Sequence, residues 1–301
     1  MSKENKPGLV SVIVPAYNRA SLIAETMDSV FAQTYRPIEL LIVDDGSTDK
    51  TGSVVKEWAS KHNGSDSFCL RYFYQENSGA PAARNRGMSE AQGEFIQFLD
   101  SDDKLDPIKF ERQIEAIKES GFPVAVCDYL RIATEDKTKN ILRLSNSGNL
   151  WKKVANMGSL FISTPLIQSD SIAETLRWNT DVKRNQDMDF MLRYFLGVRG
   201  WIYTPGFWSI YIIHKNSQIS DSYYLGTQYF KLVKSLYTYW WANKSVIPKE
   251  NRWIVLRFAV VIFRLFLSKW ILRMPYRILC SLFPFLKGKK GITAACVNVN
   301  D

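Results

Sequence analysis

The chain has 301 residues, enough for one large domain or two small ones with a substantial buried core. Its composition is 46% hydrophobic and 23% charged with 16 Gly and 11 Pro, which excludes a collagenous, low-complexity or wholly disordered protein. Ten basic residues and one acid lie between positions 249 and 290, so this segment alone carries the formal net charge of +9 and the remainder is neutral.

The first half of the chain alternates apolar runs with stretches of helical periodicity. This alternation is typical of a parallel sheet covered by helices. Asp106 and Pro107 have the residue types of an N-cap and a first helical position. We predict strands at residues 10–14, 38–43, 70–74, 95–99 and 124–127, and helices at 20–33, 51–60, 82–91 and 107–119.

Beyond residue 128 the alternation weakens. Residues 132–149 are polar and loop-like, whereas residues 151–167 are apolar but interrupted by Gly158 and Pro165. Helical periodicity returns at residues 188–196, and residues 201–213 have the pattern of a strand.

The last segment, residues 251–290, is both apolar and basic. Its longest uncharged stretch before Pro275 is residues 258–263, which is too short to span a bilayer. A helix of this kind lies at an anionic membrane surface, or it packs as a basic amphipathic helix on the body or on another subunit. We expect the membrane surface, and no nucleic acid, as partner.

Cysteine spacing and the N-terminus indicate the compartment. Four widely spaced cysteines form no CxxC pair, so neither a disulfide framework nor a zinc site is indicated. Residues 1–8 are polar and lack the apolar segment of a secretory signal. We therefore expect a cytoplasmic protein, peripheral on the inner face of the membrane.

Polar side chains follow the first two predicted strands, where ligands of parallel α/β sheets bind. Residues 15–19 contain neither a dinucleotide-binding glycine pattern nor a P-loop. Tyr17 can stack on a planar base there, or it is a half-buried aromatic residue at a turn. After the second strand, Asp44 or Asp45 can accept hydrogen bonds from a base, while residues 46–49 suit a tight turn and a helix cap.

Two more aspartates, Asp100 and Asp102, follow the fourth predicted strand. Alternate residues of an extended backbone share a face, so these two carboxylates lie together and repel each other unless a cation joins them. Mg²⁺ and Mn²⁺ prefer oxygen ligands, which predicts a divalent metal site. The alternative is a capped turn, although Asp106 already fills that role.

Together these stretches resemble the inverting family 2 glycosyltransferases. The matching segments VSVIVPAYNRA, ELLIVDDGSTDKT, ENSGAPAARNRG and GEFIQFLDSDD cover roughly residues 9–128 in the family's order and spacing. The resemblance implies an α/β fold of GT-A type, with a mostly parallel Rossmann-like sheet flanked by helices; the composition of the last segment adds a C-terminal amphipathic helical segment. It divides the chain into a nucleotide-sugar-binding half (9–128), an acceptor-binding and catalytic-base half (129–220) and a helical basic region (221–301).

The resemblance also implies roles for matched residues on the donor side. A divalent cation, Mn²⁺ or Mg²⁺, is the implied cofactor, with Asp102 as its direct ligand. His214 is similar to a C-terminal histidine of the family that approaches the metal or the diphosphate, or it is a packed or surface histidine. Asp100, which forms the DxD motif with Asp102, is implied to contact both the nucleotide and the metal. The remaining roles are the nucleotide for Ser101, the diphosphate for Arg84, and the nucleotide base for Pro15, Tyr17 and Asp45.

The family's catalytic carboxylate matches Asp187, in the stretch Asn185–Phe190. Gln186 stands where the family usually has Glu, a departure that bears on acceptor contacts. Asp187 is implied as the general base, or it only caps a helix. Asp189 lies about 200° around a helix from Asp187, so both cannot face the site.

The implied function is transfer of a sugar from a nucleotide-diphosphate donor, by resemblance a UDP-sugar, to a glycan or lipid-linked acceptor in cell-surface polysaccharide biosynthesis. A sugar nucleotidyltransferase is an alternative, but it needs a glycine-rich basic loop that residues 15–19 lack. A non-catalytic nucleotide-sugar-binding partner protein is another, and Gln186 keeps it open. Trp178 and Trp201 are either sugar platforms or core residues.

Overall fold

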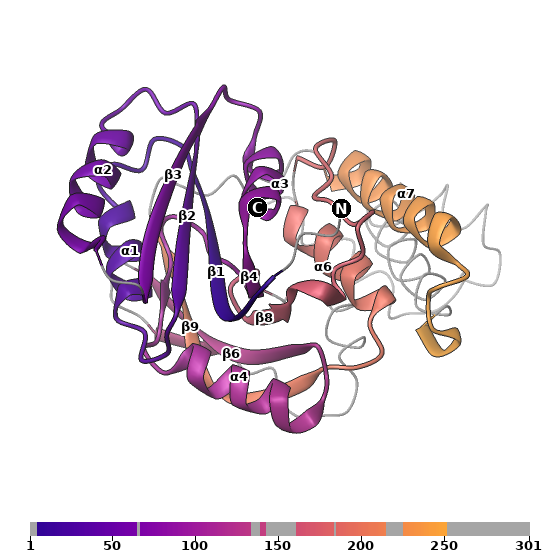
Figure 1. Cartoon of the computed structure of the whole chain (residues 1–301). Coiled ribbons are helices and arrows are strands. Elements are labelled where there is room, and N and C mark those ends of the chain that lie inside the picture. Colours follow the sequence, from indigo (N-terminus) through magenta and orange to yellow (C-terminus); the bar gives the residue numbers. More distant parts are fainter. Residues whose placement is uncertain are drawn as a thin grey trace, which may run out of the picture. The chain divides into compact units, whose positions relative to one another are not determined.

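The computed structural model describes residues 5–64, 67–133, 139–142, 161–183, 185–214 and 225–251. Nine strands of this part of the chain form one sheet, in the order β3-β2-β1-β4-β8-β6-β9-β5 with β7 beside β6 (Figure 1). The chain divides into two compact units, residues 1–252 and 253–301, and the second lies outside the described residues. From residue 252 onward, the segment predicted to contact the membrane therefore lies outside the described residues.

The first four strands form the expected parallel sheet. Strand β1 pairs with β2 on one side and β4 on the other, with Val12 opposite both Leu40 and Gln97. Because β1 is central and buried on both faces, its residues are apolar in succession rather than alternately. The bounds are Lys6–Ala16 for β1, Ile38–Asp45 for β2, Phe68–Gln75 for β3 and Gly93–Phe98 for β4.

Helices cover both faces of this parallel part. Helices α1 (Ile23–Phe31) and α2 (Thr51–His62) lie on one face and α3 (Ala80–Glu90) lies on the other (Figure 1). Gly87 brings α3 close to the sheet, since a Cβ there would lie 2.3 Å from Ile13 Cγ2. The contact fixes how closely α3, which carries Arg84, packs on β1.

Helix α1 begins three residues later than the sequence pattern predicts. Residues 19 and 20 are held in the loop because the Arg19 amide donates to Thr51 Oγ1 (2.8 Å) and the Ala20 amide donates to Asp49 (3.1 Å). The N-cap position of the helix is Leu22. The loop after β1 is thereby tied to the loop after β2.

The second half of the sheet is mixed. Strand β8 runs antiparallel between β4 and β6, whereas β6 and β9 are parallel. Pro165, expected to interrupt an apolar stretch, begins β8, a position where a missing amide is tolerated. The bounds are Lys104–Leu105 for β5, Val124–Ala133 for β6, Lys139–Leu142 for β7, Pro165–Gln168 for β8 and Ile202–Ile213 for β9.

The prediction of a loop over residues 132–149 is wrong where the structure describes it. Strand β6 continues to residue 133, and β7 pairs with it antiparallel from Tyr129 opposite Leu142 to Ile132 opposite Lys139. The two strands follow each other in the chain, and the polar composition of the stretch concealed their pairing. Residues 143–149 lie outside the description.

The remaining helices cover the second half. Helix α4 (Lys109–Ser120) packs on β6 and β9 and ends at Gly121, which has a left-handed φ of 68°. The helix begins two residues later than predicted, with Ile108 and not Asp106 at the N-cap position; the Asp106 carbonyl accepts from the Lys109 amide and its side chain from the Ile108 amide. Helix α6 (Gln186–Gly197) packs against α7 (Leu225–Asn243); the short 3₁₀ helices are η1 (Ser169–Ser171) and η3 (Lys249–Asn251).

Of these helices, none in the described residues is long and apolar enough to cross a membrane.

The close approach of α3 to β1 predicts that Gly87→Ala destabilises the protein. The added methyl group overlaps Ile13 in a packed core, which costs about 1–3 kcal/mol. Thermal unfolding measures the effect as a fall in melting temperature of roughly 2–4 °C per kcal/mol. Gly197→Ala is the control, because a Cβ there meets only Tyr239 Oη at 3.8 Å. Equal melting temperatures for the two variants would contradict this packing.

Candidate active site

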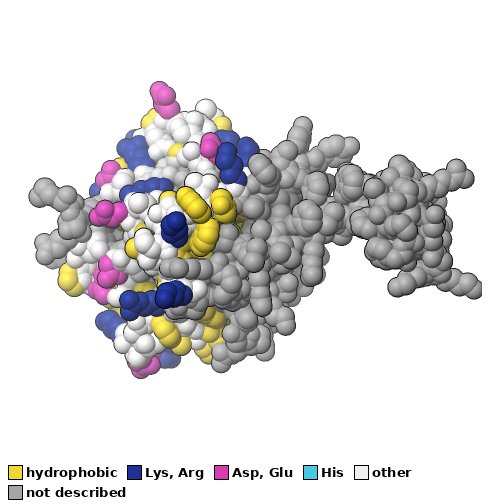
Figure 2. All heavy atoms as spheres, turned by 90° about the vertical axis from the view of Figure 1, so that its right-hand side faces the viewer, with side chains coloured by type: hydrophobic (Ala, Val, Ile, Leu, Met, Phe, Trp, Pro, Cys, Tyr) yellow, Lys and Arg dark blue, Asp and Glu magenta, His cyan; other side chains and the backbone are white. Residues whose placement is uncertain are grey.

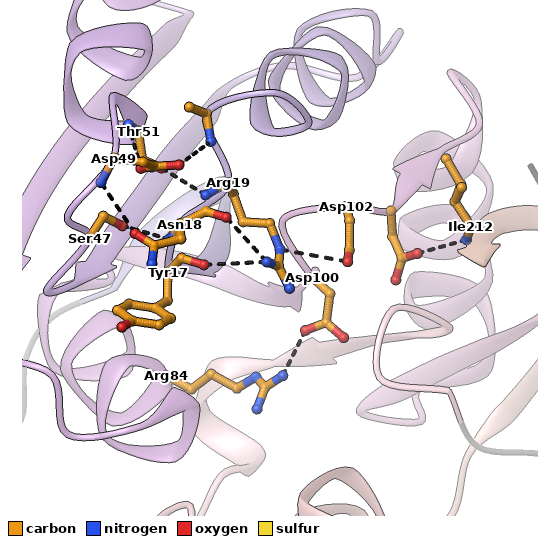
Figure 3. A network of polar contacts seen from close by, with 12 residues as sticks. Tyr17, Asn18, Arg19, Ser47, Asp49, Thr51, Arg84, Asp100, Asp102 and Ile212 are labelled. Atoms are coloured by element: carbon orange, nitrogen blue, oxygen red, sulfur yellow. Dashed lines mark hydrogen bonds and ion pairs between the residues drawn. The ribbon is translucent and has the colours of Figure 1, made fainter. Parts of the chain in front are cut away.

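The site lies where β1, β2 and β4 end. These strands are neighbours and parallel, so their carboxyl ends lie at one edge of the sheet. Figure 3 shows Tyr17, Asn18 and Arg19 from the loop after β1 beside Asp100 and Asp102 from the loop after β4. The structure thus brings together residues that the sequence places more than eighty positions apart.

Asn18 holds the loop after β1. Its φ of 52° is left-handed, a conformation that Asn tolerates better than most residues. Its side-chain oxygen accepts from the amides of Thr48 (2.9 Å) and Asp49 (3.3 Å), and its own amide donates to Ser47 Oγ (2.9 Å). The Tyr17 ring consequently projects away from this network and stays 46% exposed, which leaves a face for stacking (Figure 3).

Asp44 and Asp45 are buried and have local hydrogen-bond partners. Asp44 accepts from Tyr72 Oη (2.6 Å) and the Ser47 amide (2.8 Å). Asp45 accepts from Gln75 Nε2 (2.7 Å) and from the amides of Ser78 (3.0 Å) and Gly79 (2.7 Å). The adjacent aspartates therefore anchor the turns into α2 and α3. The base-binding roles of Asp45 and of buried Pro15 in β1 stay predictions.

Arg84, from α3, joins the two sides of the site. Its Nη2 lies 2.7 Å from Asp100 Oδ1 and 3.9 Å from Asp187 Oδ1, and its Nη1 donates to Gln186 Oε1 at 3.2 Å. Burial by itself lowers the pKa of Arg84, but the charges of Asp100 and Asp187 outweigh it and the net pKa is raised. Arg84 is thus a permanent buried cation between two carboxylates.

Trp178 forms the platform beneath Arg84. The guanidinium carbon lies 4.5 Å from the centre of the Trp178 ring, which stacks on Phe190 at 4.4 Å with an interplanar angle of 4°. Asn85 fixes the Trp178 backbone with hydrogen bonds of 2.9 Å to its carbonyl and 2.7 Å from its amide. Trp178 is 2% exposed, so of the two roles considered for it the core role is confirmed.

The predicted metal ligands lie at the end of β4. Burial and the charge of Asp100 raise the pKa of Asp102, whereas Arg19 and His214 lower it. Arg19 Nε is 3.7 Å from Asp102 Oδ2. His214, just after β9, is therefore close enough to Asp102 to influence its charge.

These residues fit a divalent cation. Asp100 and Asp102 repel each other, and a cation relieves that repulsion. Within the described ranges no group of three or more His, Cys, Asp or Glu residues surrounds one metal position. Mg²⁺ commonly takes only one or two carboxylates and completes its shell with substrate phosphates and water, so three protein ligands are not required.

The sequence predicts no role for Asp103, nor for Arg19, whose contact with Asp102 is described above. Asp103 is fully buried, and its Oδ1 accepts from the Ile212 amide at 2.9 Å, which ties the aspartate turn to β9. Burial, Asp100 and Asp102 hold its pKa well above the usual range. Its signal in the sequence was a third acid in the DSDD stretch, which also contains the buried Ser101.

Asp187 lies in the first turn of α6. The helix begins at Gln186 after Asn185, whose left-handed φ is 55°, so Asp187 lies inside the helix and is not its cap. Shielding from water raises the pKa of Asp187 to about 6; Arg84 opposes this shift and Asp100 adds to it. Asp189 is buried on the other side of α6 in an ion pair with Arg193, as the helical angle predicts.

Comparison with known proteins identifies the family. Residues 11–170, just over half of the chain, match the family model of glycosyl transferase family 2. The chain belongs to this family, which confirms the resemblance seen in its motifs.

Relatives and solved structures agree with this assignment. The putative teichuronic acid biosynthesis glycosyltransferase TuaG of Bacillus subtilis is 38% identical over 127 residues, which cover 42% of this chain and 49% of TuaG. S. aureus TarS 1-349 in complex with UDP-GlcNAc has a TM-score of 0.68 at 18% identity, covering 96% of this chain and 78% of that one. The mannosyltransferase PcManGT of Pyrobaculum calidifontis, in complex with GDP-Man and Mn²⁺, has a TM-score of 0.56 at 18% identity, covering 95% and 82%.

These structural likenesses confirm the predicted fold class. The chain spans about half or less of the length of the curated relatives that it matches.

The charge balance around Arg84 predicts the effect of Gln186→Glu. The new carboxylate would be a third negative group beside Arg84, so we expect the pKa of Asp187 to rise by about one unit, equivalent to about 1.4 kcal/mol of repulsion. A ¹³C NMR titration of the Asp187 carboxyl measures the change. Gln92→Glu, at the opposite end of β4, adds the same charge as a control. An unchanged or lower pKa in Gln186→Glu would contradict the arrangement.

Proposed function

We propose that the chain is an inverting glycosyltransferase that moves a sugar from a UDP-sugar to a glycan or lipid-linked acceptor of the cell surface. One observation carries the proposal: buried Arg84 links Asp100, on the donor side, to Asp187, on the acceptor side, within a family 2 chain. The UDP-GlcNAc complex of TarS supports a UDP-sugar donor, and the name of TuaG supports a cell-surface polysaccharide as product.

The donor side would bind the nucleotide through stacking and charge. Exposed Tyr17 offers a ring to the base, while Arg84 directs a cationic fork toward the diphosphate. Asp102, with Asp100 and His214, would hold Mn²⁺ or Mg²⁺, and the Mn²⁺ complex of PcManGT supports this cofactor. When bound, such an ion neutralises charge on the diphosphate leaving group.

Arg19 would supply a second cation on the donor side. Its Nη1 donates to the carbonyls of Tyr17 (3.4 Å) and Asn18 (3.3 Å), so it is anchored beside the stacking residue as well as beside Asp102. A guanidinium held in this position can approach the same phosphate oxygens as Arg84. Preorganised donors of this kind stabilise the transition state because they need no reorientation as charge develops.

The acceptor side would supply a general base. With a pKa of about 6, Asp187 is a carboxylate at neutral pH, yet basic enough to take a proton from an attacking hydroxyl. The hydroxyl attacks the anomeric carbon on the face opposite the diphosphate, so one displacement inverts that carbon. No covalent enzyme intermediate is needed.

The structure also bears on the two alternatives. The loop after β1 is organised by the Asn18 side chain and not by a glycine-rich basic phosphate loop, which argues against a nucleotidyltransferase. Gln186 bonds to Arg84 and leaves the carboxylate of Asp187 within the site, which favours catalysis over binding alone. We further propose that residues 251–290 hold the protein peripherally on the inner face of the membrane.

Replacement of the base tests the function. Asp187→Asn removes the proton acceptor but retains the shape of the side chain, so we expect the rate of transfer to fall about 10²- to 10⁴-fold while donor binding persists. Release of UDP measures turnover, and thermal stabilisation by UDP-sugars with Mn²⁺ measures binding. Near-normal transfer by Asp187→Asn would refute the assignment.

The acidic limb of the wild-type pH profile gives a second readout of the same residue. Protonation removes the base, so kcat/KM should fall about tenfold per unit below a pH of about 6. Asp102→Ala provides the contrast, because it should lose turnover together with its response to added Mn²⁺.

A further inference from the structure

Helix α7 has two faces, and one of them holds it to the body. Leu232 and Leu236 are each 1% exposed and Tyr239 is 9% exposed, on the side where α7 packs against α6. Asn243 continues this side, since its side-chain oxygen accepts from Thr175 Oγ1 at 3.3 Å. The orientation of α7 about its own axis is therefore fixed.

The opposite face carries aromatic rings in solvent. Tyr237 and Trp241 are one helical turn apart, 52% and 57% exposed, with ring centres 6.4 Å apart. Lys234 and Lys244 lie one turn before and after them, and Lys244 Nζ stands 4.3 Å from the centre of the Trp241 ring. Just beyond the helix, Val246 is 72% exposed. We call these five residues the outer face of α7.

The charge of α7 and of the turn that follows it has one sign up to Lys249. Residues 225–249 contain four lysines and no Asp or Glu. Figure 2, which looks at the side of the first unit that bears α7, shows hydrophobic side chains gathered beside Lys and Arg side chains. Removing the apolar area of this face from water is favourable. Its lysines, however, keep their charge and require anions nearby.

We propose that the outer face of α7 docks on the surface of an anionic lipid bilayer. Tyr and Trp have an apolar body with a polar tip, which suits the depth of the headgroups, and lysine ammonium groups reach outward to lipid phosphates. The inference rests on the proposed function and deepens it, because it names the surface from which a lipid-linked acceptor would come.

Charge argues against the two protein occupants of this face. A second copy in a symmetric pair would place its own lysines opposite these lysines, and lysine is depleted at protein interfaces. Residues 249–290 of the chain itself carry ten basic residues and one acid, so laying them on this face would also juxtapose like charges. An anionic bilayer offers an apolar interior to the rings and phosphate groups to the lysine ammonium groups.

The position of α7 places the proposed docking surface close to the helix that bears the proposed base. Its inner face packs on α6, whose first turn carries Gln186 and Asp187. Asn179 Nδ2 donates to Ser235 Oγ at 3.1 Å, which ties α7 to the segment that follows buried Trp178. Bilayer contact through α7 would therefore lie one helix away from the element that bears the proposed base.

Vesicle sedimentation of the full chain tests the proposal. We compare vesicles of phosphatidylcholine mixed with phosphatidylglycerol against phosphatidylcholine alone. The double variant Tyr237→Ser, Trp241→Ser should bind the anionic vesicles about tenfold or more weakly than wild type, since it loses the two rings that enter the interface. Tyr74→Ser is the matched control, because Tyr74 is also 57% exposed but lies on β3. It should bind as wild type does.

Two further measurements keep the outcome decisive. Lys234→Glu, Lys244→Glu changes only exposed charges and should weaken binding to anionic vesicles by a similar factor, even if loss of the rings disturbs folding. UDP release in solution should stay at the wild-type level in both double variants, so that failure of docking is distinguishable from failure of the proposed function. Wild-type vesicle affinity in both, or a change in oligomeric state at unchanged vesicle affinity, would overturn the proposal.

Discussion

A buried guanidinium organises the whole site. Arg84 is 4% exposed, and a cation that is so fully removed from water is stable only when anions surround it. Asp100, Asp187 and the Gln186 oxygen meet that requirement, and each comes from a segment other than α3. The position of one charge therefore fixes the loop after β4 against the start of α6, which are the two halves between which a sugar would pass.

The packing around Arg84 is arranged to keep it in place. Gly87 lets α3 lie close to β1, and the stacked pair of Trp178 and Phe190 supports the guanidinium from the second half of the chain. Asp103 ties the aspartate turn to β9. The carboxylates are thus held at short range by rigid elements, and their mutual repulsion makes the site receptive to a divalent cation.

Much of the fold was predictable because its cause is local. The parallel strands are continuous apolar runs buried on both faces, and the helices between them repeat at helical spacing. The sequence does not predict strands β5, β7 and β8, since β5 has two residues, β7 owes its pairing to β6, and β8 begins at a proline in an interrupted apolar stretch. The aspartates of the site were visible at strand ends, but the role of Trp178 depends on a contact across about ninety residues that no local pattern encodes.

The substitution Arg84→Lys tests the central interaction most directly. Lysine retains the charge but cannot reach Asp100, Asp187 and Gln186 together with a planar fork. We predict that the variant folds, that UDP-sugars with Mn²⁺ no longer raise its melting temperature as they do for wild type, and that turnover falls about 100-fold or more. Stabilisation by donor and turnover within a few-fold of wild type would contradict the account.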